Sequence, residues 1–223
     1  MHNSMMACAA SLAVAGVVHA EFLGFEVSSS TFGNLVKSEV YAKFSGSTDT
    51  LLNAFHLNRV AGGAAPVFYH SDALSGGANS STVGSWNPTF VLSAGAFDSY
   101  VCIGGGEGPL SGNTTNADPD WGQAGFNQAQ VPFLGAPGNT TNGPGWFNSN
   151  PPNLQGRVDS NGRVKVGQFV TAVGAASTTM FLKVGYVAAA GGSPLFGDGT
   201  FTVPAPGALA ALAAAGLLRR RRR

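Results

Sequence analysis

The sequence has 223 residues, 44% of them hydrophobic, which suits one domain with a sizeable core and short appendages. Only 10% of the residues are charged and 32 are glycines, a composition that argues against a helical cytoplasmic enzyme and is typical of a secreted β protein with many turns. Five of the twelve basic residues stand at the C-terminus. The rest of the chain therefore has seven basic against eleven acidic residues, and this acidic balance argues against nucleic acid as a partner.

Residues 1–20 are predicted to form a secretory signal peptide with a short apolar helix. Met5 to Val18 is a short apolar stretch, and the small residues Val18 and Ala20 stand where a signal peptidase reads the chain. No Lys or Arg precedes this stretch, so either the N-terminal amine supplies the positive charge or the true start lies upstream. A buried first helix is the alternative interpretation. Removal of the peptide would make Glu21 the first residue of the mature protein.

Residues 21–202 are predicted to form one extracellular all-β domain, because several segments alternate apolar and polar residues with the period of a half-buried strand. Many short strands with Gly-rich turns favour an antiparallel β-sandwich with a jelly-roll-like architecture. The residues expected to share one face of a strand are Val40, Ala42 and Phe44; Leu51, Asn53, Phe55 and Leu57; Val164, Val166 and Val170; and Met180, Leu182, Val184 and Tyr186.

Residues 104–153 differ from the rest of this domain, because they are rich in Gly, Asn, Pro and Thr and show no strand pattern. We expect this long loop to be the most mobile part of the body. Two interpretations are open for its aromatic residues. They form a sugar-stacking platform, with Trp121 and Trp146 as the glycan-binding residues, or they fold back and plug one end of the sandwich. The aromatic residues are Trp121, Phe126, Phe133, Trp146 and Phe147.

Catalytic and metal-binding motifs are scarce in this sequence. No nucleophile elbow, P-loop or dinucleotide-binding fingerprint is present, and His56 and His70 lack the spacing of zinc ligands. Cys102 lies in an apolar run and is expected to be a buried small hydrophobe. Asn116, Asp118 and Asp120 resemble the start of a calcium loop, but Pro119 and the missing downstream Glu favour a solvated acidic turn. We therefore expect no cofactor, no metal and no enzyme activity, although a pair of carboxylates for glycoside hydrolysis stays open.

Val203 to Leu218 is almost wholly apolar and is followed by five arginines. A helix from Gly207 to Leu218 would be roughly 18 Å long, which is short for a hydrocarbon core of about 30 Å. Snorkelling of the arginines and some thinning of the bilayer would close part of this gap. Arginines stay on the cytoplasmic side of a membrane, so the tail predicts a short transmembrane helix with the body outside.

The chain ends in Val203, Pro204, Ala205 and Pro206, an apolar run and an arginine cluster. This three-part arrangement resembles the PEP-CTERM sorting tail of exported proteins from Gram-negative bacteria. The resemblance implies recognition by an exosortase, a membrane-embedded cysteine protease that cleaves near the Pro-x-Pro motif. Ala205 stands where the family has Glu. The body, in segments such as "FDSYVCIGG", is similar to exported bacterial β proteins of unassigned function. The motif is formed by Val203, Pro204, Ala205 and Pro206, and after the apolar helix the arginine cluster is formed by Arg219, Arg220, Arg221, Arg222 and Arg223.

These features together predict an exported structural or adhesive protein of the cell envelope, cell surface or extracellular matrix. The tail at residues 203–223 would anchor it transiently in the inner membrane, and extracellular polysaccharide is a candidate partner. A carbohydrate-binding module that uses the loop aromatics is the alternative, and a polysaccharide-acting hydrolase is the third interpretation.

Overall fold

The structure of the chain is a computed structural model that describes residues 20–60, 65–70, 85–88, 97–105, 112–128, 130–188 and 192–204. The predicted signal helix and the predicted membrane helix with its arginines fall on residues 1–19 and 205–223, outside the described residues. Within the described ranges, no helix is both long enough and apolar enough to cross a bilayer. Both helices therefore stay predictions.

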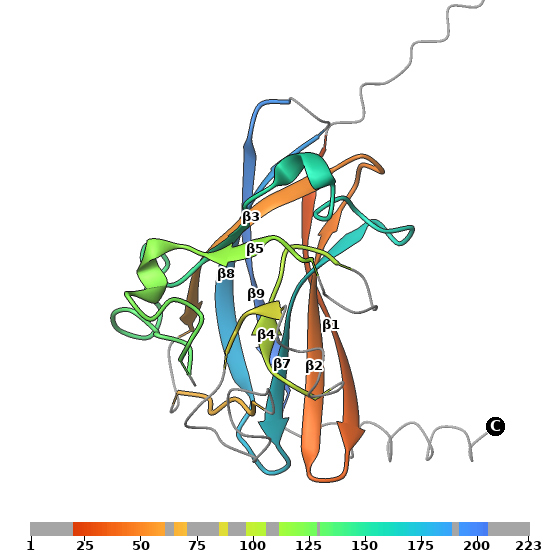
Figure 1. Cartoon of the computed structure of the whole chain (residues 1–223). Coiled ribbons are helices and arrows are strands. Elements are labelled where there is room, and N and C mark those ends of the chain that lie inside the picture. The colour runs from red at the N-terminus through yellow and green to blue at the C-terminus, as the bar shows by residue number, and fades with distance from the viewer. Residues whose placement is uncertain are drawn as a thin grey trace, which may run out of the picture.

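Two antiparallel β-sheets make up the described body, which confirms the predicted all-β class (Figure 1). One sheet has four strands in the order β1-β2-β7-β4, and the other has five in the order β5-β6-β3-β8-β9. The strands are β1 (Phe22–Phe32), β2 (Leu35–Phe44), β3 (Thr50–Arg59), β4 (Tyr100–Val101), β5 (Thr115–Ala117), β6 (Trp146–Asn148), β7 (Arg163–Ala172), β8 (Thr178–Val187) and β9 (Leu195–Val203), and two short 3₁₀ helices are η3 (Pro119–Trp121) and η4 (Pro151–Asn153).

The two sheets share one apolar core between their inner faces, and burial of apolar area at roughly 25 cal/mol per Å² is the main stabilising term. The alternation predicted for β2 and β8 is confirmed, because each strand sends every second side chain into this core. The β2 residues in the core are Val40, Ala42 and Phe44, and the β8 residues are Met180, Leu182, Val184 and Tyr186.

The sheets approach each other most closely where β1 lies beside β9. Phe25 packs against Phe201 with ring centroids 5.5 Å apart, and Phe22 packs over Gly197. A Cβ at position 197 would lie 2.5 Å from the ring of Phe22, so the seam requires glycine there. The two outer strands thus close one side of the sandwich through side-chain packing.

Irregular register makes two of the predicted shared faces wrong. On β7, a shift places Val40 opposite Gly167 and Tyr41 opposite Lys165. As a result, Val164 and Val166 stay in the core, whereas Val170 pairs with Lys37 on the opposite face. A β-bulge inserts one residue and reverses the alternation beyond it, which a strict period of two cannot anticipate.

The strand β3 deviates from the prediction for the same reason. Register shifts against β8 lie between Leu51 and Asn53 and between Phe55 and Asn58. Leu51 and Leu57 enter the core as predicted, but Asn53 and Phe55 pair with Gly185 and Lys183 on the outer face. His56 sits within the second shift with φ of 57°, a left-handed conformation that is costly for a residue with a Cβ.

Residues 104–153, predicted as a long loop because they show no confident strand pattern, contain two short strands. This segment supplies β5 and β6, which extend the five-stranded sheet beyond β3. Ala54 of β3 pairs with Trp146 of β6, and Trp146 pairs in turn with Ala117 of β5. Strands of three residues are too short to produce a recognisable alternation. The pairing of β6 with β3 and of β5 with β6 defines them, and their sequence does not.

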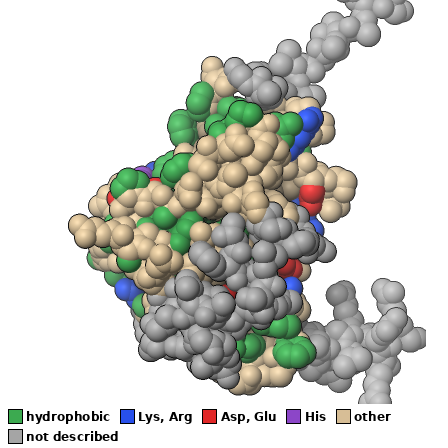
Figure 2. Space-filling view, viewed as in Figure 1, with side chains coloured by type: hydrophobic (Ala, Val, Ile, Leu, Met, Phe, Trp, Pro, Cys, Tyr) green, Lys and Arg blue, Asp and Glu red, His purple; other side chains and the backbone are tan. Residues whose placement is uncertain are grey.

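The surface reflects the low charge content of the sequence. On the face seen in Figure 2, Lys, Arg, Asp and Glu side chains are sparse, and hydrophobic side chains lie in small patches among polar ones. Patches of this kind are ordinary on a folded protein, so the larger hollows of the surface are a better guide to function.

Candidate functional site

The described surface has a hollow beside each sheet. The first, the Phe147 hollow, has a volume of about 680 Å³. The second, the Arg157 hollow, has a volume of about 410 Å³. Asn87, Asn116, Ala117, Asp118, Pro119, Gly122, Gln123, Ala124, Gly125, Phe126, Asn127 and Phe147 line the first. Tyr41, Gly104, Gly105, Gln155, Arg157, Asp159, Asn161, Arg163, Val164 and Lys165 line the second.

The predicted glycan-binding residues Trp121 and Trp146 do not line either hollow, because both are core residues that are 2% and 1% exposed. Trp121 donates its indole N–H to the carbonyl of Gly145 at 2.6 Å, and Trp146 donates to the carbonyl of Cys102 at 3.0 Å. With their faces packed and their donors used, neither can stack on a sugar. The structure corrects this part of the prediction and agrees with the alternative in which loop aromatics fold back onto the core.

Phe147 is the loop aromatic that faces outward. It follows the buried Trp146 on β6, and successive side chains of a strand point to opposite faces, so its ring is 37% exposed. It pairs with Asn116 of β5 on one side and Asn53 of β3 on the other. The exposed ring is thus held on a rigid strand between two amide side chains.

Asp118 supplies the one carboxylate in the lining of the Phe147 hollow. It caps η3 by accepting a hydrogen bond from the backbone N–H of Asp120 at 3.1 Å. Burial raises the pKa of Asp118, and the neighbouring charge of Asp120 adds to this effect. Asn116 and Asp120 are exposed, in keeping with a solvated turn. Among the residues that the structure describes, no group of three or more His, Cys, Asp or Glu is placed to hold a metal ion.

A network of opposite charges covers the outer face of β1, β2 and β7 beside the Arg157 hollow. Arg163 bonds Glu26 and, at 3.3 Å, Asp159, and its guanidinium lies 4.1 Å from the centre of the Tyr41 ring. Lys43 contacts the other oxygen of Glu26 at 3.0 Å. Desolvation alone would raise the pKa of Asp159, but hydrogen bonds from Asn161 and Arg163 hold it below its usual value.

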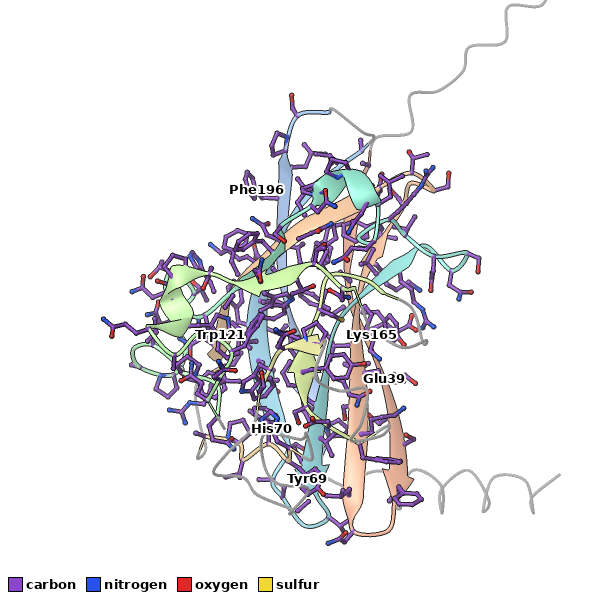
Figure 3. The ribbon with its side chains drawn as sticks, in the orientation of Figure 1. Glu39, Tyr69, His70, Trp121, Lys165 and Phe196 are labelled. Carbon is purple, nitrogen blue, oxygen red and sulfur yellow. The ribbon has the colours of Figure 1, made fainter. Side chains whose placement is uncertain are left out.

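The most buried ion pair of this face joins Lys165 of β7 to Glu39 of β2, and the two residues lie together in Figure 3, far from Phe196 on β9. Burial by itself would raise the pKa of Glu39. The hydrogen bond and charge of Lys165, together with the charge of Lys37, instead hold the pKa of Glu39 below its usual value. Glu39 is therefore ionised and paired, which suits a structural ion pair better than an acid catalyst.

Cys102 and His70 are both enclosed by protein. Cys102 is fully buried, as predicted, and burial raises its pKa to about 12, so the thiol is inert. His70 is also fully buried, with its Nδ1 3.2 Å from Oδ1 of Asp98 and its ring centroid 4.8 Å from that of Trp86. The 27 residues that separate His70 from Asp98 in the sequence hid this contact. Neither residue lines either of the two hollows.

The sorting motif is described only at its start. Val203 is the last residue of β9, is 2% exposed and belongs to the core, and Pro204 follows it. Ala205, Pro206 and the arginine cluster at 219–223 lie outside the described residues. In the comparisons with known proteins, no family model matches the chain, and neither a curated protein nor a solved structure shows significant similarity to it.

Proposed function

We propose that the chain is an exported, non-catalytic protein with a structural or adhesive role in the cell envelope or extracellular matrix, and that the Phe147 hollow is its carbohydrate-binding surface. The observation that carries this proposal is the exposed Phe147 ring on a rigid strand at the rim of a hollow rich in amide side chains. An apolar ring face matches the C–H groups of a sugar, and amides match its hydroxyls.

The geometry favours binding over chemistry. Glu26, Glu39 and Asp159 are committed to ion pairs on the four-stranded sheet, and Asp118 caps η3 beside the hollow. Glycoside hydrolysis needs two carboxyl groups that face each other across the substrate, about 5 to 9.5 Å apart. Asp118 is the single carboxylate in the lining of the Phe147 hollow, so a binding role fits this site better.

The route to the cell surface is the second part of the proposal. The N-terminal signal peptide would direct export, and the C-terminal tail would hold the protein in the inner membrane until an exosortase releases it. Because Val203 is part of the core, cleavage that leaves an intact body must fall after this residue. A jelly-roll-like connectivity of the sandwich belongs to the same proposal.

Glycan-array binding of the full chain tests the adhesive role. We expect saturable binding to at least one neutral oligosaccharide and a loss of about tenfold in affinity for Phe147→Ala, since one aromatic contact is worth roughly 1 kcal/mol or more. Phe32→Ala is the matched control, because Phe32 is 63% exposed on β1 of the other sheet. An array without any saturable ligand, or an equal loss in both variants, would contradict the proposal.

Cell fractionation tests the route. Replacement of Arg219 to Arg223 with Ser should release the folded body prematurely into the medium, because each arginine near an anionic leaflet contributes about 1 kcal/mol to anchoring. The measurement is the partition of the body between membrane pellet and supernatant. Unchanged partition would show that the arginines are not part of the anchor.

A further inference from the structure

The basic residues of the body are unevenly distributed over its surface. Outside the C-terminal cluster the chain has seven Lys and Arg against eleven Asp and Glu. Five of these seven, Lys37, Lys43, Arg157, Arg163 and Lys165, lie on or beside the outer side of β2 and β7, and three of the five line the Arg157 hollow. The body, which is acidic apart from its C-terminal arginines, thus gathers most of its positive charge on one sheet, and three of these five cations line one hollow.

The cations of this site differ in how far they are neutralised. Arg163 is paired with Glu26 and Asp159, and Lys165 is paired with Glu39. Arg157 is exposed, and no ion pair or side-chain hydrogen bond joins it to another residue of the described chain. Its guanidinium is therefore the group that can accept a new anion without breaking an existing contact.

The rest of the lining narrows the class of ligand. Asp159 brings the one carboxylate, and its oxygens already accept hydrogen bonds from the backbone of Asn161 and from Arg163. The amide of Asn161 and the backbone of Gly105 supply neutral polar groups of the kind that bind hydroxyls, whereas the N–H of Gly104 already donates to the carbonyl of Lys165. A fork-shaped cation beside neutral hydrogen-bonding groups matches a ligand that carries both a carboxylate and hydroxyls.

We propose that the Arg157 hollow binds the carboxylate of an acidic saccharide, with Arg157 as the anion-binding residue. This site goes beyond the proposed Phe147 hollow and does not depend on it, because the two hollows share no lining residue. The protein then has two saccharide sites of different chemistry, one for neutral sugar faces and one for uronic acids.

Binding of the full chain to polygalacturonate, measured by isothermal titration calorimetry, tests the proposal. Fully methyl-esterified polygalacturonate is the matched ligand, because it keeps the sugar backbone and loses the charge. We expect binding to the acid form only, and a loss of about tenfold in affinity for Arg157→Gln, the effect of one charge-assisted hydrogen-bonded contact. Arg157→Lys should recover part of the loss, because a lysine keeps the charge without the planar fork.

Lys183→Gln is the control variant, since it removes one positive charge from β8 of the other sheet. Equal weakening by both variants would overturn the proposal by showing attraction to net charge alone. Equal affinity for the esterified polymer, or binding of polyphosphate with none of polygalacturonate, would overturn it as well. The two sites can be tested separately. Neutral glycans should bind less tightly to Phe147→Ala and with unchanged affinity to Arg157→Gln.

Discussion

The outer faces of the two sheets are built from different side chains. The face of β1, β2 and β7 carries charged residues that pair with one another, and its central pair, Glu39 and Lys165, is largely buried. The face of the five-stranded sheet carries exposed rings, Phe147 on β6 and Phe196 on β9, with the polar Asn53 between their strands. Both sheets enclose the same core, so the inner faces decide the fold and the outer faces are free to differ in chemistry.

Substitution of neighbouring residues on β6 gives the largest expected effect. Trp146→Ala should lower the free energy of unfolding by about 3 to 5 kcal/mol, because it empties a core site and leaves the carbonyl of Cys102 without its donor. Phe147→Ala, one residue along, should cost less than about 1 kcal/mol. Urea denaturation measures both. Similar losses of stability in the two variants would show that the inner and outer faces of β6 do not differ in their contribution to the free energy of unfolding.

The buried ion pair of the opposite sheet should be the next most sensitive. Glu39→Gln should lower the free energy of unfolding by about 3 kcal/mol, because it leaves the ammonium of Lys165 buried without a countercharge. The double variant Glu39→Gln with Lys165→Met should recover much of this loss, because no unpaired charge then remains. A double variant as unstable as the single one would mean that packing, and not charge, explains the effect.

Glu39 and Asp118 should make the free energy of unfolding depend on pH in opposite directions. The pKa of Glu39 is lowered, so its ionised form stabilises the fold above about pH 4.5, and this contribution is lost as the pH falls through the lowered pKa. The pKa of Asp118 is raised, so its ionised form carries a penalty that grows as the pH rises above about 3.8.

Urea unfolding of wild type, Glu39→Gln and Asp118→Asn between pH 3 and 7 measures these slopes. With rising pH, wild type should gain stability relative to Glu39→Gln and lose it relative to Asp118→Asn. If both stability differences changed with pH in the same direction, the predicted opposite effects of Glu39 and Asp118 would be contradicted.

The smallest effect is expected at the rim of the charged face. Lys43 and Glu26 form an ion pair whose side chains are 39% and 38% exposed. Lys43→Ala should change the free energy of unfolding by less than about 1 kcal/mol, because solvent screens such pairs. Added salt should shrink even this difference. A loss of stability as large as that caused by Glu39→Gln would mean that the contribution of these ion pairs does not depend on their burial.

The fold could be predicted from the sequence for those strands in which apolar and polar residues alternate regularly. The core residues of β2 and β8 follow the period of two, so the all-β class and these faces could be anticipated. The bulges in β3 and β7 could not be, because the inserted residue is defined by the partner strand. The same limit explains β5 and β6, whose three residues each carry too little pattern.

The sequence singled out the aromatic residues of 104–153 as candidates for sugar binding. Trp121 and Trp146, the two residues named for this role, are buried. The alternation of Trp146 and Phe147 within a strand would have selected Phe147, had β6 been recognised. No feature of the sequence singled out Arg157, because the role proposed for it depends on the neutralisation of Arg163 and Lys165 by residues from other parts of the chain.

The edges of the two sheets bear on how such a protein behaves at high concentration. An open strand edge recruits a second chain and leads to aggregation. Here the long edge strands β1 and β9 lie against each other, and the opposite edges, β4 and β5, have two and three residues. In the described part of the chain, little strand edge is therefore open for pairing with a second copy, and assembly into a matrix would proceed through the faces of the sandwich.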